Sequence, residues 1–162
     1  MNQSVNIVAF TGHRTYTGAA NEELRQTIAE LYEHGARTFR VGMAEGFDLC
    51  AAEIVAELKL SHPDIILEAC IPWPDFPSRF TPSDRERYNK IITSASIIRY
   101  ASSSYSVDIF HRRNDMLIDG CNTVVAWWEG RSSGTGYTVR RARRHGCRII
   151  NLFSRELFAT SL

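Results

Sequence analysis

The sequence predicts an α/β protein built on one open, doubly wound and mostly parallel sheet with helices on both faces. Short runs rich in β-branched residues alternate with segments of helical periodicity. The loops between them are short, and strands joined by helical crossovers pair in parallel. No internal repeat or linker interrupts the 162 residues, which suffice for one substantial core. We therefore expect a single domain over residues 1–162.

The first half of the chain predicts a β-α-β-α-β unit. An apolar run, VNIVAF, ends at a Gly-containing loop and suits a strand buried on both faces. Asn21 is expected as the N-cap of the first helix, and Gly35 is expected to stop that helix. A second strand, a small-residue loop, a second helix and a third strand repeat the pattern.

The second half of the chain continues the alternation of strands and helices. Over the whole chain, the expected strands are residues 5–10, 38–41, 65–71, 96–100, 123–127 and 148–152. The expected helices lie between Asn21 and Gly35, at residues 47–58, from about residue 83 through 91, and at residues 107–118 and 135–145.

One segment stands outside this alternation. Four of the five prolines fall in PWPDFPSRFTPSD, residues 72–84, which is expected to be irregular. Its aromatic residues Trp73, Phe76 and Phe80 are interpreted as packing anchors of a long loop. Stacking on a nucleobase is the less favoured alternative, and the sequence leaves their role open.

The composition argues against several classes of protein. With 44% hydrophobic and 23% charged residues, the chain is expected to be globular rather than disordered. A net charge of +1 supplies no global field that would attract nucleic acid or an anionic membrane. The chain has no apolar stretch approaching roughly 18 residues and no signal-peptide pattern at its start, so we expect a cytoplasmic protein.

The four cysteines do not indicate a metal site. Cys50, Cys70, Cys121 and Cys147 form no C-x-x-C pair, and three of them lie in apolar or small-residue runs. Buried, reduced thiols are therefore expected rather than disulfides or a zinc site. We predict neither a metal nor a required cofactor.

The predicted topology indicates where a ligand binds. In a doubly wound sheet, ligands bind beyond the carboxyl ends of the strands, where the crossovers diverge to opposite faces. Five loops satisfy this rule: residues 11–18, 42–48, 72–80, 100–107 and 128–136.

The first of these loops begins with Thr11, Gly12, His13 and Arg14. Glycine directly after a buried strand lets backbone N–H groups approach an anion, Thr11 offers a hydroxyl, and the Arg14 guanidinium matches phosphate or carboxylate. The alternative is that His13 and Arg14 are ordinary solvated loop residues. The role of His13 is left undecided.

Two further loops carry small residues between a strand and a helix. Room for a phosphate or ribose at a helix N-terminus is predicted at Gly42, Ala44, Gly46 and Asp48, and again at Gly134, Thr135, Gly136 and Tyr137. A carboxylate such as Asp48 suits ribose hydroxyls better than phosphate. The alternative for Asp48 is a side chain that only stabilises the helix start.

Two basic segments are weighed differently. Arg113 and Asn114 belong to a helix that follows one of these loops, so they are candidate ligand-binding residues. The run of basic residues that closes the next helix is interpreted as a solvated face stabilised by the helix dipole, and nucleic-acid binding through it is the less favoured alternative. That run comprises Arg140, Arg141, Arg143, Arg144 and His145.

Taken in order, these motifs resemble the YpsA/YspA-like branch of the SLOG superfamily, over nearly the whole chain. The residues that carry the resemblance are Thr11-Gly12-His13-Arg14, Gly42-x-Ala44-x-Gly46-x-Asp48 with Ala51-Ala52-Glu53, Arg113-Asn114 and Gly134-Thr135-Gly136-Tyr137-Thr138-Val139. The superfamily also contains the Smf DNA-processing proteins and the "lonely guy" phosphoribohydrolases. The resemblance implies a Rossmann-like fold that binds or processes nucleotides or nucleotide-derived ligands, often as a homo-oligomer.

The phosphoribohydrolase relatives use a catalytic Arg and a catalytic Glu. The resemblance places Arg113 in the Arg position, but the Glu position falls on Thr138. Cleavage of an N-glycosidic bond needs a carboxylate near the developing ribosyl cation, which Thr138 does not supply. Glu129, Asp48 and Glu45 are the candidates to replace it.

Three functions are therefore considered. The favoured one is a nucleotide-binding sensor or regulatory protein, in which Arg14 faces Arg113 across a phosphate and Asp48 accepts from ribose hydroxyls. The first alternative is a nucleoside monophosphate phosphoribohydrolase that uses Arg113 with Glu129 or another relocated carboxylate. The second alternative is an Smf-like DNA-binding module.

Overall fold

The computed structural model describes residues 6–153, which form a six-stranded sheet and five α-helices. The strands are β1 (Asn6–Gly12), β2 (Ala36–Val41), β3 (Ile66–Ile71), β4 (Ile97–Tyr100), β5 (Thr123–Trp127) and β6 (Arg148–Asn151). The helices are α1 (Asn21–Glu33), α2 (Phe47–Ser61), α3 (Pro82–Ser94), α4 (Ile109–Ile118) and α5 (Gly134–Arg144), with a 3₁₀ turn, η1, at Phe76–Arg79.

All neighbouring strands pair in parallel, in the order β4-β3-β2-β1-β5-β6. The chain moves outward from β1 to β4, then crosses back to β5 on the other side of β1. Because parallel crossovers are right-handed, this reversal puts the later helices on the opposite face from the earlier ones. The predicted doubly wound α/β fold is confirmed.

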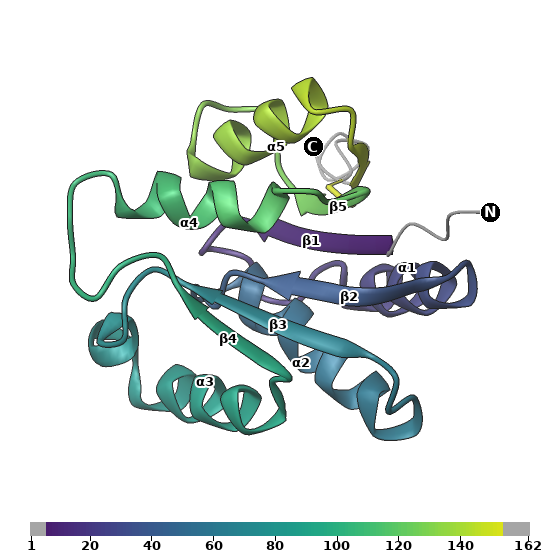
Figure 1. Ribbon diagram of the computed structural model, residues 1–162, viewed down its shortest axis with the longest axis horizontal. Coiled ribbons are helices and arrows are strands. Elements are labelled where there is room, and N and C mark those ends of the chain that lie inside the picture. Colours follow the sequence, from purple (N-terminus) through teal and green to yellow (C-terminus); the bar gives the residue numbers. More distant parts are fainter. Residues whose placement is uncertain (1–5, 154–162) are drawn as a thin grey trace, which may run out of the picture.

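Two buried clusters fill the space between the sheet and its helices. On one face Val8 and Phe10 of β1 pack with Leu24 of α1 and with residues of α2 and α3. On the other face Ala9 packs with Leu117 of α4 and with residues of α5. Figure 1 shows α4 and α5 together at the top of the view, and α2 and α3 at the bottom. The alternation of side chains along β1 thus supplies both layers.

The central strand β1 extends further than the sequence predicts. Thr11 and Gly12 are expected in a loop, but they are the last two residues of β1, and Gly12 pairs with Trp127 of β5. The reversal of strand order falls between these two strands, so their carboxyl ends mark the point where the crossovers diverge.

The expected N-cap of α1 is wrong by one residue. Asn21 is the first residue of the helix, and Ala20 precedes it as the N-cap. The Tyr16 hydroxyl accepts a hydrogen bond from the Ala20 N–H at 2.9 Å and donates to Asn21 Oδ1 at 2.6 Å. A tyrosine from the preceding loop therefore satisfies the helix start, which the local pattern does not reveal.

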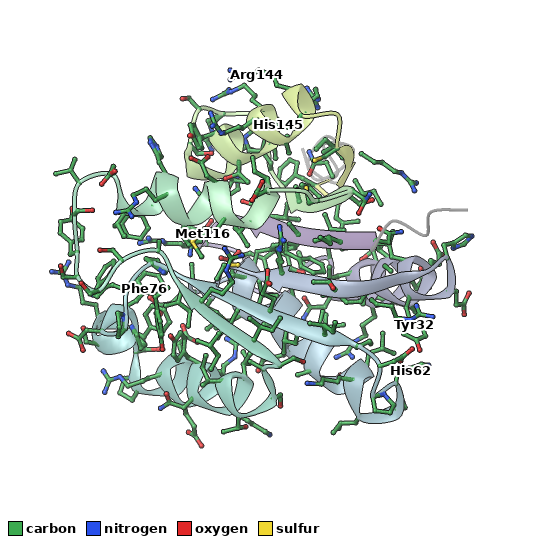
Figure 2. The ribbon with its side chains drawn as sticks, viewed as in Figure 1. Tyr32, His62, Phe76, Met116, Arg144 and His145 are labelled. Carbon is green, nitrogen blue, oxygen red and sulfur yellow. The ribbon has the colours of Figure 1, made fainter. Side chains whose placement is uncertain are left out.

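The proline-rich segment is more regular than predicted. It contains the turn η1, and α3 already begins at Pro82, because proline fits the first helical position and Thr81 caps it by accepting from the Asp84 N–H. Phe76, which Figure 2 labels, and Phe80 are buried, as expected of packing anchors.

The four cysteines are free thiols, but not all of them are buried, and two of them lie in contact. Cys50 and Cys121 are partly exposed, contrary to the expectation, while Cys70 and Cys147 are buried. The Sγ atoms of Cys121 and Cys147 lie 2.9 Å apart.

None of the helices within residues 6–153 is both long and apolar enough to cross a membrane.

Candidate ligand-binding cavity

A cavity of about 360 Å³ opens at the carboxyl ends of β1 and β5, where the strand order reverses. Its walls come from the ends of β1 and β2, from α4 and from the start of α5. The candidate residues that line it are Thr11, Gly12, His13, Arg14, Ala44, Asp48, Arg113, Asn114, Gly134 and Thr135. The fold therefore brings together most of the residues selected by the loop rule.

Four other candidates lie outside the wall, and for three of them the reason is contact between loops. A side chain on Gly42 would overlap Asp48 and Arg113, and one on Gly46, where φ is +83°, would meet the His13 and Arg14 carbonyl groups. A Cβ on Gly136 would lie 3.0 Å from the Arg131 carbonyl oxygen and 3.1 Å from the Trp128 ring. These glycines pack the loops together behind the cavity instead of facing a ligand.

The fourth of these, Tyr137, points away from the cavity. Its ring stacks on His111 at a centroid distance of 4.3 Å, and its hydroxyl donates to Asp115. Thr138, at the position of the relatives' catalytic Glu, also lies outside the wall and donates its hydroxyl to the Gly134 carbonyl group within α5.

Arg113 is a buried cation held in a fixed direction. Its Nη1 donates to the Gly42 carbonyl oxygen at 2.5 Å, and its Nε donates to Asn114 Oδ1 at 2.9 Å. Among residues 6–153, Nη2 forms no hydrogen bond, and Arg113 is one of the residues that line the cavity. Burial lowers the pKa of the Arg113 guanidinium, while the nearby Asp48 carboxylate raises it.

Asp48 places a buried carboxylate in the same wall. It lies in the first turn of α2, but its Oδ2 accepts from the Ala44 N–H at 3.2 Å, a residue of the preceding loop, so it does not act as an ordinary helix cap. Burial raises the pKa of Asp48 to about 6, although the Arg113 charge and the Ala44 hydrogen bond act in the opposite direction.

Arg14 is an exposed cation at the rim of the cavity. Its guanidinium lies 5.5 Å from the centre of the Phe110 ring, and within the described part of the chain it forms no ion pair. Like Arg113, it carries a positive charge close enough to Asp48 to lower the pKa of that carboxyl. Arg14 and Arg113 thus both line the same cavity.

The first turn of α5 completes the cavity. Ser133 is its N-cap, with Oγ accepting from Gly136. Gly134 and Thr135 line the cavity, and their N–H groups form no hydrogen bond with any residue in the described ranges. Free N–H groups at a helix N-terminus attract an anion, and here they share a cavity with two guanidinium groups.

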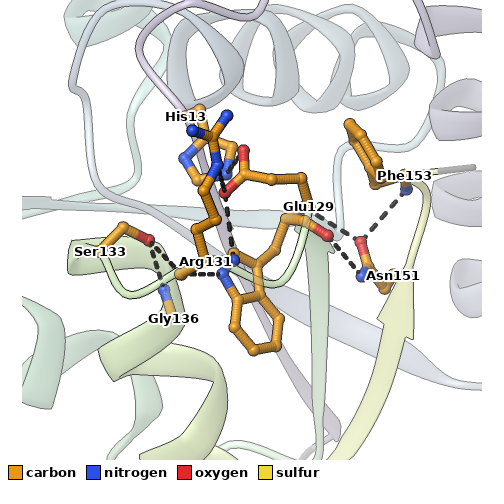
Figure 3. A network of polar contacts seen from close by, with 8 residues as sticks. His13, Glu129, Arg131, Ser133, Gly136, Asn151 and Phe153 are labelled. Carbon is orange, nitrogen blue, oxygen red and sulfur yellow. Dashed lines mark hydrogen bonds and ion pairs between the residues drawn. The ribbon is translucent and has the colours of Figure 1, made fainter. Parts of the chain in front are cut away.

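His13, which lines the cavity, contacts Glu129, which does not. His13 Nε2 and Glu129 Oε2 are 2.7 Å apart, and Figure 3 shows the two side chains pointing toward one another. The His13 ring also meets the edge of Trp127. Glu129 itself does not line the cavity, so of the carboxylates considered as catalytic only Asp48 does; Glu45 lines a neighbouring cavity.

Sequence reasoning missed two residues of the wall, Phe110 and Leu117, whereas Ser133, which also lines it, belongs to the Ser- and Gly-rich loop that the sequence indicates as a phosphate cradle. Phe110 and Leu117 lie on the same face of α4 as Arg113 and Asn114, at the i, i+3, i+4 and i+7 spacing of one helix face. That spacing is the signal that could have identified them. Ser133 directly precedes the Gly134 motif as the N-cap of α5.

Within residues 6–153, no cluster of His, Cys, Asp and Glu side chains could hold a metal ion. The cavity instead combines two guanidinium groups, two free N–H groups and one carboxylate. This arrangement can bind an anionic group and accept hydrogen bonds from neighbouring hydroxyls.

Comparison with known proteins places this chain among relatives. The family model described as the YspA SLOG family matches residues 3–147. A UPF0398 protein from Bacillus cereus strain G9842 is 22% identical over 156 residues, covering 88% of this chain and 85% of the relative. A UPF0398 protein from Halalkalibacterium halodurans is 33% identical over 73 residues, which is 45% of this chain and 39% of the relative.

Two solved structures share the fold. DNA processing protein A (DprA) from Streptococcus pneumoniae superposes with a TM-score of 0.65 at 20% identity, over 90% of this chain. The Helicobacter pylori DNA processing protein A, whose structure addresses its single-stranded DNA binding mode, matches with the same values. This chain spans 49% of the first protein and 64% of the second.

Proposed function

Because the chain belongs to the YspA SLOG family, we propose that it binds a nucleotide or nucleotide-derived ligand at the carboxyl edge of its sheet, as a sensor or regulatory protein. The observation that carries this proposal is the cavity in which Arg14, Arg113 and the free N–H groups of Gly134 and Thr135 face one space. Several positive groups that converge on one point favour a phosphate.

Each part of the cavity has a role in this proposal. Arg14 and Arg113 neutralise the phosphate from two sides, and the start of α5 donates hydrogen bonds to its oxygens. Asp48 accepts from ribose hydroxyls, which suits a carboxylate better than contact with phosphate. No metal or cofactor is needed, and we propose that the protein acts as a homo-oligomer, as the resemblance implies.

The proposal is tested by calorimetry and thermal shift with AMP, ADP-ribose, NAD and cyclic nucleotides. At least one of them is expected to bind. Arg14→Ala is expected to lower the affinity for that ligand about 10-fold or more, because a charge-assisted hydrogen bond is lost. Arg144→Ala is the matched control, since Arg144 is also exposed but lies at the far end of α5, as Figure 2 shows. Failure of every ligand to bind, with Arg14→Ala behaving as wild type, would overturn the proposal.

A phosphoribohydrolase is the second candidate, and the position of Asp48 favours it. The relatives' Glu is replaced by Thr138, but Asp48 puts a carboxylate into the wall that holds Arg113. Such a carboxylate can stabilise a ribosyl cation as the base departs. Release of ribose 5-phosphate from a nucleoside monophosphate, abolished by both Arg113→Ala and Asp48→Asn, would establish this activity.

Single-stranded DNA binding is the remaining alternative, suggested by the shared fold with the H. pylori protein, which binds single-stranded DNA. The exposed Arg140, Arg143 and Arg144 of α5 would be the contact, although Arg140 lies over the Trp128 ring and Arg141 pairs with Asp115 at 2.8 Å. Salt-sensitive binding of an oligonucleotide, lost in an Arg143→Ala/Arg144→Ala variant, would support it.

A further inference from the structure

A second cavity of about 380 Å³ lies beside the ligand-binding cavity and is lined mostly by aromatic side chains. Its walls come from the proline-rich segment, from the connection between β4 and α4, and from α4. The two cavities share Arg14 and Phe110. A ligand that occupies the first cavity and extends past this pair therefore enters the second.

Trp73 lies at the centre of the aromatic cluster. Its ring meets Phe76, Tyr105 and Phe110 edge to face, at centroid distances of 5.3, 5.5 and 6.0 Å. Phe76 and Phe80 are buried and anchor the segment, but Tyr105 is 61% exposed and Trp73 is only half-buried. The ring of Tyr105 beside a cavity offers surface that the packing of the fold does not use.

The charged groups of the second cavity also suit an aromatic ligand. Arg79 is exposed and, like Arg14, forms no ion pair within residues 6–153. Aromatic rings and planar guanidinium groups are the side chains on which nucleobases stack. Glu45 adds a carboxyl group, which lies close to Thr81 and Asp84. It can accept from an amino or ring N–H group of a base.

We infer that the second cavity receives the base of a nucleotide whose sugar and phosphate occupy the first. Tyr105 and Trp73 stack on the base, and Arg14 stands where the two halves of the ligand meet. This inference rests on the function proposed above, and it narrows the ligand class to nucleotides that present an aromatic base in this position. The aromatic residues of the proline-rich segment then serve both packing and binding.

Calorimetry with two probes separates the cavities. Ribose 5-phosphate carries the sugar and phosphate alone, while AMP and GMP add a base. We expect the better of these nucleotides to bind at least 10-fold more tightly than ribose 5-phosphate. Tyr105→Ala is expected to lower the affinity for that nucleotide about 10-fold, which is within the range measured for base stacking on an aromatic ring. The affinity for ribose 5-phosphate is expected to stay unchanged.

Tyr100→Ala is the matched control, because Tyr100 is a comparably exposed ring, 48% accessible, outside both cavities. It is expected to change neither affinity. Trp73→Phe keeps an aromatic ring but removes one fluorophore, so the part of the fluorescence quench seen with the nucleotide and not with ribose 5-phosphate should disappear.

The outcomes distinguish this inference from the proposed function. If ribose 5-phosphate and both nucleotides bind equally well, or if Tyr105→Ala leaves the nucleotide affinity unchanged, the base site is overturned while phosphate binding stands. If none of the three probes binds, the base site is overturned, while the proposed function is then decided by ADP-ribose, NAD and the cyclic nucleotides.

Discussion

Asp48 and Arg113 approach each other over the backbone of Gly42. A methyl group on Gly42 would lie 2.7 Å from Asp48 Oδ2 and 3.2 Å from Arg113 Nη1, which already donates to the Gly42 carbonyl oxygen. Because Gly42 has no side chain, the buried Asp48 carboxyl group and the buried Arg113 guanidinium have room to line the same cavity. Because both side chains are among the most buried charged groups of the fold, small changes here should affect stability and binding together.

We predict that Gly42→Ala destabilises the protein by about 1–3 kcal/mol, because the new methyl group overpacks this site and Asp48 must move. Urea unfolding measures the loss. Gly134→Ala is the matched control, since a Cβ at Gly134 meets no atom within 4 Å. Equal stability of the two variants would contradict the packing role of Gly42.

The raised pKa of Asp48 predicts a specific dependence of stability on pH. Its pKa is about 6 in the folded protein and 3.8 when unperturbed, so between these values the folded state holds a proton that the unfolded state has lost. Stability contributed by this proton is fully present below about pH 4 and is lost as the pH rises to 6. At 1.36 kcal/mol per pKa unit, the loss amounts to roughly 3 kcal/mol.

Asp48→Asn should remove this decline, because the amide does not titrate and its oxygen can still accept from the Ala44 N–H. Urea unfolding of wild type and variant at pH 4, 5, 6 and 7 makes the comparison. Asp119→Asn, which changes an exposed carboxylate outside the ligand-binding cavity, is the control. Parallel pH profiles for wild type and Asp48→Asn would show that Asp48 is not the titrating group.

The alternation of strands and helices was predictable from the sequence because it depends on local periodicity. Loops that follow parallel strands meet at one edge of the sheet, so Arg14 and Arg113 could be expected in one cavity although they are far apart in the chain. The strand order could not be predicted in the same way, since the pairing of β1 with β5 depends on long-range contacts.

The details that sequence reasoning missed depend on the directions of side chains. Gly134 and Tyr137 belong to the same motif of α5. Gly134 lies in the cavity wall, whereas the Tyr137 side chain points toward His111. The same limit applies to the start of α1, where Tyr16 arrives from another segment and displaces Asn21 from its expected role. Cys121 and Cys147 likewise meet only in the folded protein.

The pairing of His13 with Glu129 predicts a modest effect of Glu129→Gln. Since Glu129 supports His13 from outside the cavity, we expect nucleotide affinity to fall only a few-fold and any release of ribose 5-phosphate to persist. Calorimetry and a coupled assay for ribose 5-phosphate test this, with Asp48→Asn as the contrasting variant. Complete loss of release in Glu129→Gln alone would instead assign the catalytic carboxylate to Glu129.

A buried ion pair fixes the position of α4 and therefore of Arg113. Arg40 Nε and Glu68 Oε2 are 2.5 Å apart, and Arg40 also donates to the Leu117 and Asp119 carbonyl groups at the end of α4. We predict that Glu68→Ala destabilises the protein by about 3–5 kcal/mol, because it leaves the Arg40 charge buried without its partner.

The double variant Arg40→Leu/Glu68→Leu separates the cost of an unpaired charge from the value of the pair. Replacing both charges by apolar groups is expected to cost less than Glu68→Ala alone, since no buried charge then lacks a partner. Glu57→Ala provides the control, because its ion pair with Arg25 is exposed and should contribute at most about 1 kcal/mol. Urea unfolding ranks the three variants. If the double variant is less stable than Glu68→Ala, the hydrogen bonds from Arg40 to the end of α4 outweigh the cost of its unpaired charge, and ligand affinity should then fall with the loss of α4 positioning.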